Sequence, residues 1–220
     1  GAEIRNYLLE KSRVVIQAKT ERNYHVFYGI LRFMDPNRLK QYGYFQMEKY
    51  NYLKKSECFQ WETIDDKEFF TDTCSSFNRL GFNQEEQDGV FKTLATVLNL
   101  GNVQIDSSTF IEGEQPCGIK MEEYFEKVLK ILEVDREEFI EGICCQKRTL
   151  PGGQVLLSPR TPANAEAIRD ALAKDMFNNV FNWIVRKLNL TLLPENPKQY
   201  TSVGLLDIFG FEDFNVNSIE

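Results

Sequence analysis

The sequence predicts a mainly helical domain with a few short β-strands. In most of the chain, apolar side chains recur every three or four residues, and several of these segments follow a side chain that can cap a helix. Short apolar and β-branched runs stand near both ends, where strands are expected. With 220 residues, 42% hydrophobic and 13% aromatic, the chain can form one large domain or two small ones around a packed core.

Composition excludes several classes of function. A net charge of -7 argues against a nucleic-acid-binding protein, because phosphate backbones attract a clustered positive face. No apolar run approaches the roughly 20 residues of a membrane span, so we expect no membrane insertion. The single histidine, His25, argues against a Ser/His/Asp triad, and we interpret it as a packed or hydrogen-bonded side chain. Five cysteines without a Cys-x-x-Cys pair indicate a reducing cytoplasm.

The first third of the chain combines expected strands with aromatic-rich segments. Residues 2–9 loosely alternate and residues 14–16 are β-branched, so both are predicted strands. Residues 24–34 have a helical period that ends at Asp-Pro-Asn. Residues 40–62 are irregular and contain four tyrosines. These tyrosines could form a stacking surface, but partial burial in the core is the preferred interpretation.

Capping side chains mark where the later helices begin. A side-chain oxygen on the residue just before a helix accepts hydrogen bonds from the free backbone N–H groups of the first turn. Between these helices, residues 103–118 are rich in Gly, Pro, Ser and Glu and are expected to form a surface loop. A helical face also covers residues 121–132. The predicted starts are Asp65 for residues 67–80, Asn83 with Glu86 for a helix to residue 100, Asp135 for a helix to residue 143, and Thr161 before Pro162.

A hairpin and a long helix are expected in the last third. Pro151-Gly152-Gly153 predicts a turn between residues 146–150 and 154–157, in a hairpin that projects into solvent. The long helix carries an apolar stripe that should face the core. Residues 202–206 then form a short apolar run, suited to a strand buried on both faces. The stripe consists of Ile168, Leu172, Met176, Val180, Ile184 and Leu188, widened by Ala171, Phe177 and Phe181.

The motif that indicates chemistry begins directly after this last strand. Asp207 is followed by Gly210, in the pattern Asp-x-x-Gly. A carboxylate at the carboxyl end of a strand can hold Mg²⁺ through water, and a glycine three residues later lets a backbone N–H approach a γ-phosphate. Alone, the pattern also fits an ordinary strand end followed by a turn, and an unrelated P-loop GTPase or a kinesin-like protein would share it.

The residues around this motif make it more specific. The string Asp-Ile-Phe-Gly-Phe-Glu at residues 207–212, with residues 213–218 after it, closely resembles switch II of myosins and the start of their relay helix. Further strings resemble myosin heads in the same order along the chain. They are Tyr-Leu-Leu-Glu-Lys-Ser-Arg-Val at 7–14, Glu-Arg-Asn-Tyr-His-Val-Phe-Tyr at 21–28, Leu-Asn-Leu-Gly-Asn-Val at 98–103 and Arg-Asp-Ala-Leu-Ala-Lys at 169–174.

The resemblance implies a partial motor domain of the P-loop NTPase α/β fold, mainly α with strands of a central mixed β-sheet. Residues 1–16 would hold a transducer strand, residues 17–200 the helical upper 50-kDa subdomain, and residues 201–220 the switch II strand, loop and relay helix start. The chain lacks an initiator methionine and stops shortly after a helix-start signal at Asn217 and Ser218, so we interpret it as a piece of a longer chain.

Roles for the switch II residues follow from the same resemblance. Asp207 would lie in the second shell of Mg²⁺, the amide of Gly210 would contact the γ-phosphate of ATP, and Glu212 would pair with a switch I arginine around the attacking water. Such positioning and charge stabilisation is most of what phosphoryl transfer requires. No Gly-x-x-x-x-Gly-Lys-Ser/Thr phosphate cradle occurs in the chain, so we expect it neither to bind ATP tightly nor to hydrolyse it alone.

The hairpin at residues 146–165 resembles the cardiomyopathy loop, which contacts actin in the family. Lys147, Arg148 and Arg160 would suit an acidic partner surface. Many myosins carry an acidic or phosphorylatable residue sixteen positions before the Asp of Asp-Ala-Leu-Ala-Lys; counting back from Asp170 gives Gln154, which is neither. We therefore expect no phosphoregulation there.

The expected partners are the actin filament and the rest of a myosin heavy chain, in the cytoplasm on the actin cytoskeleton, with light chains or calmodulin binding outside these residues. The alternative function is a non-catalytic, myosin-like actin tether with a decayed nucleotide site. Retention of Asp207, Gly210 and Glu212 speaks against the tether, and the sequences of the phosphate loop and switch I would separate the two.

Overall fold

The computed structural model describes residues 1–19, 21–193, 201 and 203–207. Helices dominate it, and the strands of these residues form two antiparallel pairs, β1–β2 and β3–β4, besides one isolated bridge between Ile111 and Gln115. The elements in chain order are η1 (Lys11–Val14), α1 (His25–Phe33), α2 (Pro36–Gln41), η2 (Met47–Lys49), α3 (Asn51–Lys54), α4 (Asp66–Arg79), α5 (Gln84–Leu100), β1 (Ile105–Asp106), β2 (Gly118–Ile119), α6 (Glu123–Leu132), α7 (Arg136–Cys144), β3 (Cys145–Thr149), β4 (Val155–Pro159) and α8 (Pro162–Leu192).

The predicted helix caps are confirmed. The carboxylate of Asp65 accepts from the backbone N–H groups of the first turn of α4, and Asp135 does the same for α7. Asn83 and Glu86 form a reciprocal capping box at the start of α5. Thr161 caps α8, with proline at its first position. These local side-chain contacts explain why the helices begin where the sequence indicates.

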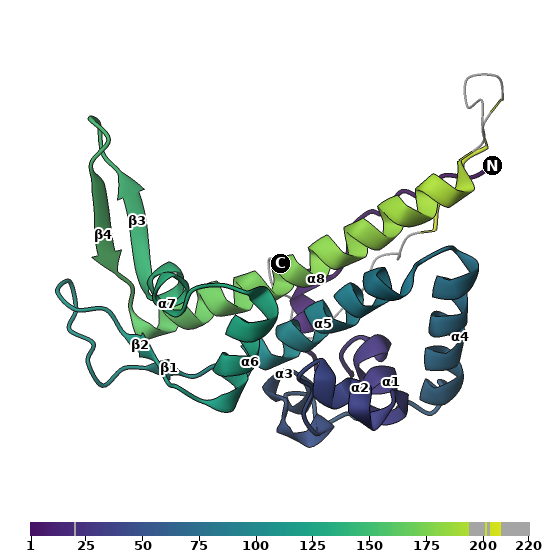
Figure 1. Cartoon of the computed structure of the whole chain (residues 1–220), viewed down its shortest axis with the longest axis horizontal. Coiled ribbons are helices and arrows are strands. Elements are labelled where there is room, and N and C mark those ends of the chain that lie inside the picture. Colours follow the sequence, from purple (N-terminus) through teal and green to yellow (C-terminus); the bar gives the residue numbers. More distant parts are fainter. Residues whose placement is uncertain (20, 194–200, 202, 208–220) are drawn as a thin grey trace.

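α5 lies at the centre of the molecule, between α8 on one side and α6 on the other, while α1 packs against α4 (Figure 1). Its second half is entirely buried from Leu94 to Leu100. The tyrosines predicted to lie in the core do so: Tyr42, Tyr44, Tyr50 and Tyr52 are at most 8% exposed. They make up part of the core through their rings and keep partners for their hydroxyl groups, as in the 2.8 Å bond from Tyr44 to the carbonyl of Phe91.

α8 spans the length of the molecule and packs with one stripe against the core (Figure 1). The stripe is the one the sequence predicts, although most of its members are half-buried; Ala165, Ala173 and Phe177 are the fully buried residues. Ala171, which was expected to widen the stripe, is exposed.

The strands predicted near the two ends of the chain do not form in the described residues. Residues 1–10 are extended but lie along α8 instead of in a sheet: Ala2 donates to the carbonyl of Leu192, and Ile4 exchanges two hydrogen bonds of 2.7 and 2.8 Å with the side chain of Asn189. Residues 14–16 end a short 3-10 helix. Residues 203–206 contain no strand, and Leu205 is 97% exposed. A strand needs a neighbouring edge to pair with, and no described segment offers one at these places.

Candidate functional site

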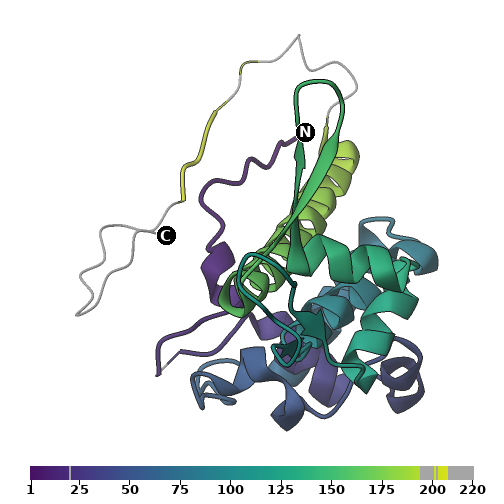
Figure 2. The same cartoon turned by 90° about the vertical axis from the view of Figure 1, so that its left-hand side faces the viewer.

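The hairpin β3–β4 projects from one end of the molecule, well clear of the helices (Figures 1 and 2). Its strands pair antiparallel over five residues each, from Cys145 opposite Pro159 to Thr149 opposite Val155. The sequence predicted this hairpin with strands at residues 146–150 and 154–157; the observed strands, Cys145–Thr149 and Val155–Pro159, extend one and two residues further at the base. Two-stranded ribbons are marginal in isolation, so its base must be held by the helices beneath it.

The hairpin surface is basic and apolar at once. Residues 145–160 include no Asp or Glu but carry Lys147, Arg148 and Arg160, whereas the chain as a whole has a net charge of -7. Lys147 stands opposite Leu157 and Arg148 opposite Leu156, and opposite residues share a face. Each face of the ribbon therefore presents one exposed cation beside one exposed leucine.

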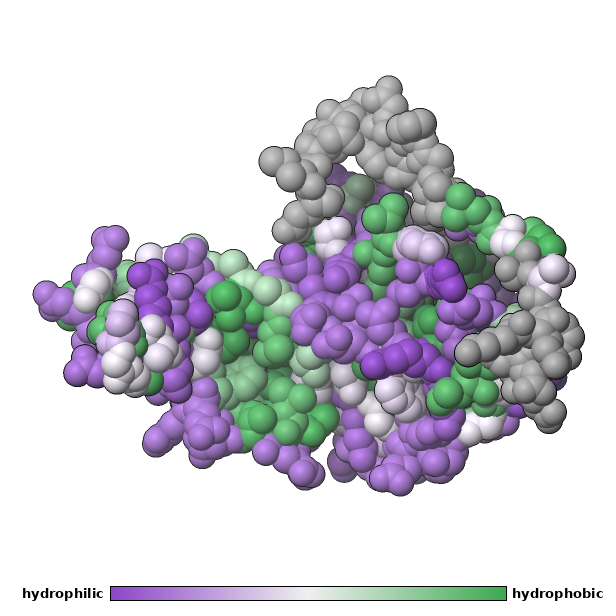
Figure 3. All heavy atoms as spheres, turned by 90° about the horizontal axis from the view of Figure 1, so that it is seen from above, coloured by the Kyte–Doolittle hydropathy of each residue, from purple (hydrophilic) through white to green (hydrophobic). Residues whose placement is uncertain are grey.

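Exposed apolar side chains continue to the tip of the hairpin. Leu150, Val155, Leu156 and Leu157 are between 41% and 54% exposed. In the space-filling view, hydrophobic and hydrophilic groups alternate over this projecting end, at the left of Figure 3. Apolar side chains within a polar rim are typical of protein–protein interfaces. The arrangement indicates a protein-binding surface more than a small-molecule site.

The tip is a tight turn that positions Gln154. The backbone N–H of Leu150 donates to the carbonyl of Gln154 at 2.8 Å, and Gly153 donates to the carbonyl of Leu150 at 3.0 Å. Gly152 and Gly153 both adopt positive φ, at 102° and 84°, which side chains with a Cβ rarely accept. Gln154 is exposed directly after them. The uncharged amide thus lies where a partner that contacts the tip would meet it.

Arg160 holds the base of the hairpin, a role that the sequence did not predict. Its Nη1 donates to the carbonyls of Gly142, Ile143 and Cys145, at 2.9 and 3.1 Å for the first two. These are the free carbonyls at the end of α7, which attract a cation. Lys147 and Arg148, by contrast, are exposed, and the guanidinium of Arg148 donates to the side chain of the neighbouring Gln146. Arg160 comes 16 residues after Cys144, the last residue of α7, so no local pattern indicates this contact, which forms only because the hairpin folds back.

A buried network ties α8, which follows the hairpin, to the core. The Tyr52 hydroxyl donates to Asp170 at 2.6 Å, and Arg169 forms a two-pronged ion pair with the same carboxylate. Arg169 also donates to the carbonyl of Val103 at 2.8 Å. Burial, together with the Asp170 carboxylate, raises the pKa of Tyr52, so its hydroxyl remains a donor. The network fixes the first half of α8 against α3 and the end of α5.

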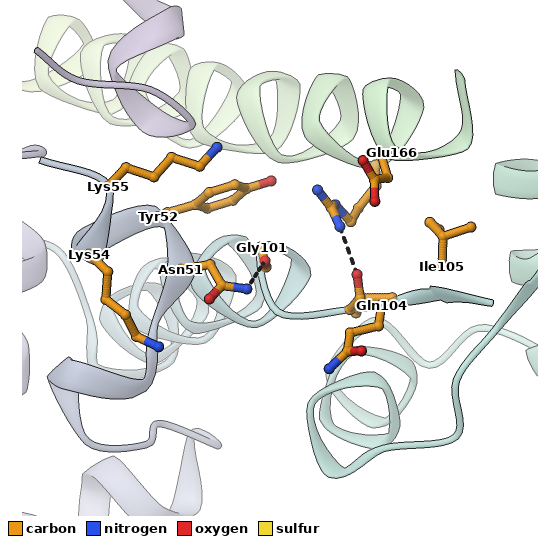
Figure 4. A pocket seen from close by; sticks show the side chains of 10 residues that line it. Asn51, Tyr52, Lys54, Lys55, Gly101, Gln104, Ile105 and Glu166 are labelled. Atoms are coloured by element: carbon orange, nitrogen blue, oxygen red, sulfur yellow. Dashed lines mark hydrogen bonds between the residues drawn. The ribbon is translucent and has the colours of Figure 1, made fainter. Parts of the chain in front are cut away.

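A pocket of about 450 Å³ opens beside this network, between α3, the α5–β1 connection and α8 (Figure 4). Lys54, Lys55 and Glu166 contribute its charged rim. Two hydrogen-bond donors in its wall are already bonded to backbone carbonyls of the protein. The side-chain amide of Asn51 donates to the carbonyl of Gly101 (Figure 4), and Lys55 donates to the carbonyl of Val15. We interpret the pocket as a gap between packed elements that has a structural role.

Of the three predicted switch II residues, the structure describes only Asp207. Asp207 is the last described residue of its segment and is exposed. Gly210 and Glu212 lie outside the described residues, so their predicted roles stay predictions. Among the described residues, no group of three or more His, Cys, Asp or Glu side chains could hold a metal ion. No helix in the described part of the chain is long and apolar enough to cross a membrane.

Comparison with known proteins identifies the class to which this fold and hairpin belong. The family described as myosin head (motor domain) matches residues 1–220, the whole chain. The chain belongs to the myosin head family.

Its relatives include several fungal myosins. It is 40% identical to Myosin-1 of Pyricularia oryzae and 39% identical to Myosin-1 of Sclerotinia sclerotiorum, in each case over all of this chain and 18% of the relative. It is 36% identical to Myosin-5 of Candida albicans, over all of this chain and 17% of that protein. The chain therefore spans less than a fifth of the length of these relatives, and it represents a piece of a motor domain.

Proposed function

We propose that this chain is the actin-contacting and phosphate-sensing piece of an actin-based motor that couples ATP hydrolysis to movement along filaments. The observation that carries the proposal is the basic, partly apolar hairpin that projects from a myosin-head chain. Light chains or calmodulin would bind elsewhere on the heavy chain. The motor is placed on the actin cytoskeleton in the cytoplasm.

The hairpin suits an acidic filament surface for two reasons. Lys147 and Arg148 are free to approach carboxylates, which steers encounter and sets orientation. Leu156 and Leu157 lie opposite them on the two faces and can supply apolar burial once contact is made. Arg160 completes the predicted cationic set but is largely engaged with carbonyls at the base, so we assign it mainly to holding the hairpin upright.

Charge reversal tests the actin contact in the complete motor protein. Lys147→Glu with Arg148→Glu should weaken actin affinity at least about tenfold, equivalent to ~1.4 kcal/mol, and should reduce its salt dependence. Lys92→Glu is the matched control, because Lys92 is exposed in the middle of α5 away from the hairpin. Equal affinities for the two variants in co-sedimentation would remove the hairpin from the actin interface.

Position 154 at the tip should be insensitive to phosphorylation. Gln154 cannot accept a phosphate and carries no charge, so kinases that regulate motors at this position have no target here. Adding a carboxylate through Gln154→Glu should change actin affinity of the complete head, with Gln154→Ala as the neutral control. If both variants match the unmodified head, position 154 is silent in this protein.

The nucleotide half of the proposal concerns Asp207, Gly210 and Glu212. In the complete head, Mg²⁺ and the phosphates of ATP supply the reacting centre; Asp207 would hold the water shell of the ion, the Gly210 amide would contact the γ-phosphate, and Glu212 would orient the attacking water. Since the chain contains no phosphate cradle, we infer that it is inactive alone. Glu212→Ala in the complete head should abolish ATP turnover, and turnover by the isolated chain above that of its own Glu212→Ala variant would contradict the inferred inactivity.

The alternative, an actin tether without ATPase activity, makes the opposite prediction for turnover. A tether would bind filaments through the hairpin, but ATP would neither be hydrolysed nor release the protein from actin. ATP-induced dissociation of the complete protein from filaments therefore distinguishes the two functions. The retained Asp-x-x-Gly-x-Glu residues favour the motor.

A further inference from the structure

Three of the five cysteines gather where the hairpin meets the helices. Cys117 lies just before β2, Cys144 is the last residue of α7, and Cys145 is the first residue of β3. Cys117 and Cys144 are 2% and 1% exposed, whereas Cys145 is half-buried. Nothing in the actin contact or in phosphate sensing uses them.

Cys117 and Cys144 are both hydrogen-bonded to the backbone of the same residue, Arg160. The Cys117 thiol donates to the carbonyl of Arg160 at 3.7 Å, while the backbone N–H of Arg160 donates to the carbonyl of Cys144 at 2.8 Å. The Cys117 thiol also lies near enough to Cys144 to raise the pKa of that thiol. Two cysteines from segments 27 positions apart are thus brought to the same buried place at the base of the hairpin.

We propose that Cys117 and Cys144 are a reversible dithiol–disulfide pair that staples the β1–β2 loop to the base of the hairpin. A small disulfide such as oxidised glutathione is the oxidant. The two protein thiols lose two protons and two electrons and form one S–S bond, while the oxidant accepts them and leaves as two thiols. The closed disulfide joins the residue before β2 to the end of α7.

The surroundings of the two thiols make them resistant to oxidation while the hairpin base is closed. They become reactive when the base opens. Burial and the neighbouring Cys117 thiol raise the pKa of Cys144 to about 12, so almost no thiolate is present to attack an oxidant. Opening of the hairpin base would expose the pair, because both cysteines are hydrogen-bonded to the backbone of Arg160, the residue that directly follows β4. Oxidation would then trap the base in a linked form, and a reductant would restore it.

The first test is chemical and independent of actin. The complete protein is incubated with oxidised glutathione, alkylated, digested and analysed by mass spectrometry. We expect a linked peptide pair containing Cys117 and Cys144 that disappears after dithiothreitol. A disulfide between the adjacent Cys144 and Cys145, or only glutathione-modified cysteines, would overturn the proposal.

The second test measures the consequence for the hairpin. Trypsin can cleave after Lys147 and Arg148 only when the ribbon opens, and a disulfide of typical stabilising effect should slow this cleavage at least about tenfold. Cys117→Ser should abolish both the link and the slowing, while Cys74→Ser, which changes a half-buried free thiol on α4, should preserve both. A linked protein that is cleaved as fast as the reduced one would overturn the staple. Because neither readout involves filaments, failure of the actin proposal would leave this result unaffected.

Discussion

A buried ion triad in the first half of the chain gives the sharpest stability prediction. Asp66, 6% exposed, receives hydrogen bonds from Arg22, whose side chain is 1% exposed, and from Arg32, whose side chain is 26% exposed. Arg32 donates to Asp66 at 2.5 Å, and Arg22 also lies over the ring of Tyr28, 4.1 Å from its centre. The triad joins α1 and the residues before it to the first turn of α4.

Replacing the carboxylate of Asp66 leaves the buried positive charge of Arg22 without its neighbouring negative charge. Opposite charges about 4 Å apart attract by roughly 4 kcal/mol at an effective dielectric constant near 20. Removing one partner of a buried ion pair typically costs about 3–5 kcal/mol, which is a similar magnitude. The Nε of Arg22 already has no partner among the described residues, so few other contacts can offset the loss. Asp66→Asn should therefore destabilise the packing of α1 on α4 by about 3–5 kcal/mol.

Hydrogen exchange of the complete head, followed on peptides from α1 and α4, measures this local effect. A loss of 3 kcal/mol corresponds to amide exchange that is faster by about two orders of magnitude, provided that exchange occurs through this opening. Arg32→Ala is the control, because Arg32 is partly solvated and its loss should cost only about 1 kcal/mol. The reasoning is refuted if Asp66→Asn exchanges no faster than Arg32→Ala.

Three further predictions concern single side chains. Arg160→Ala should leave carbonyls at the end of α7 without their donor and weaken the hairpin base by about 1–3 kcal/mol, seen as faster exchange in residues 145–159. Gly101→Ala should destabilise the head in thermal unfolding by about 1–3 kcal/mol, because the added Cβ would lie 2.6 Å from the ring of Tyr52. Gly89→Ala is the control and should be neutral or stabilising, because Gly89 has open space around it and a helical backbone. Burial, together with the nearby charge of Arg22, lowers the pKa of His25 below 6.5, so the folded state disfavours the protonated form. The free energy of unfolding should therefore decrease as pH falls through 6.5, and His25→Phe should flatten this part of the profile.

Features encoded by neighbouring residues were predictable from the sequence. Helix caps such as Asp65 and Asn83 act within three residues of themselves, and the Gly152-Gly153 turn specifies its hairpin locally. Contacts between distant segments were not predictable in this way. The ion pair between Arg22 and Asp66 joins residues 44 positions apart.

The predicted end strands do not form in the described residues for a related reason. The apolar runs at residues 2–9 and 203–206 have the composition of strands, but hydrogen-bonded partners, not composition, determine whether a strand forms. In the first run, the Asn189 side chain occupies the backbone groups of Ile4 that a neighbouring strand would use. In the candidate site, the position and the charge of the hairpin were predictable from the sequence. The binding of carbonyls by Arg160 was not, because it requires the hairpin to fold back onto α7, which local sequence patterns do not encode.

The continuity of α8 has a mechanical consequence. Its 31 residues contain no glycine and, after Pro162, no proline, so nothing in the sequence introduces a hinge over a length of about 46 Å. One end of this rod follows the hairpin directly, and the other holds the extended N-terminal segment through Asn182 and Asn189. A load that reaches the start of α8 from the base of the hairpin is therefore transmitted along a single stiff axis to the far end of this helix.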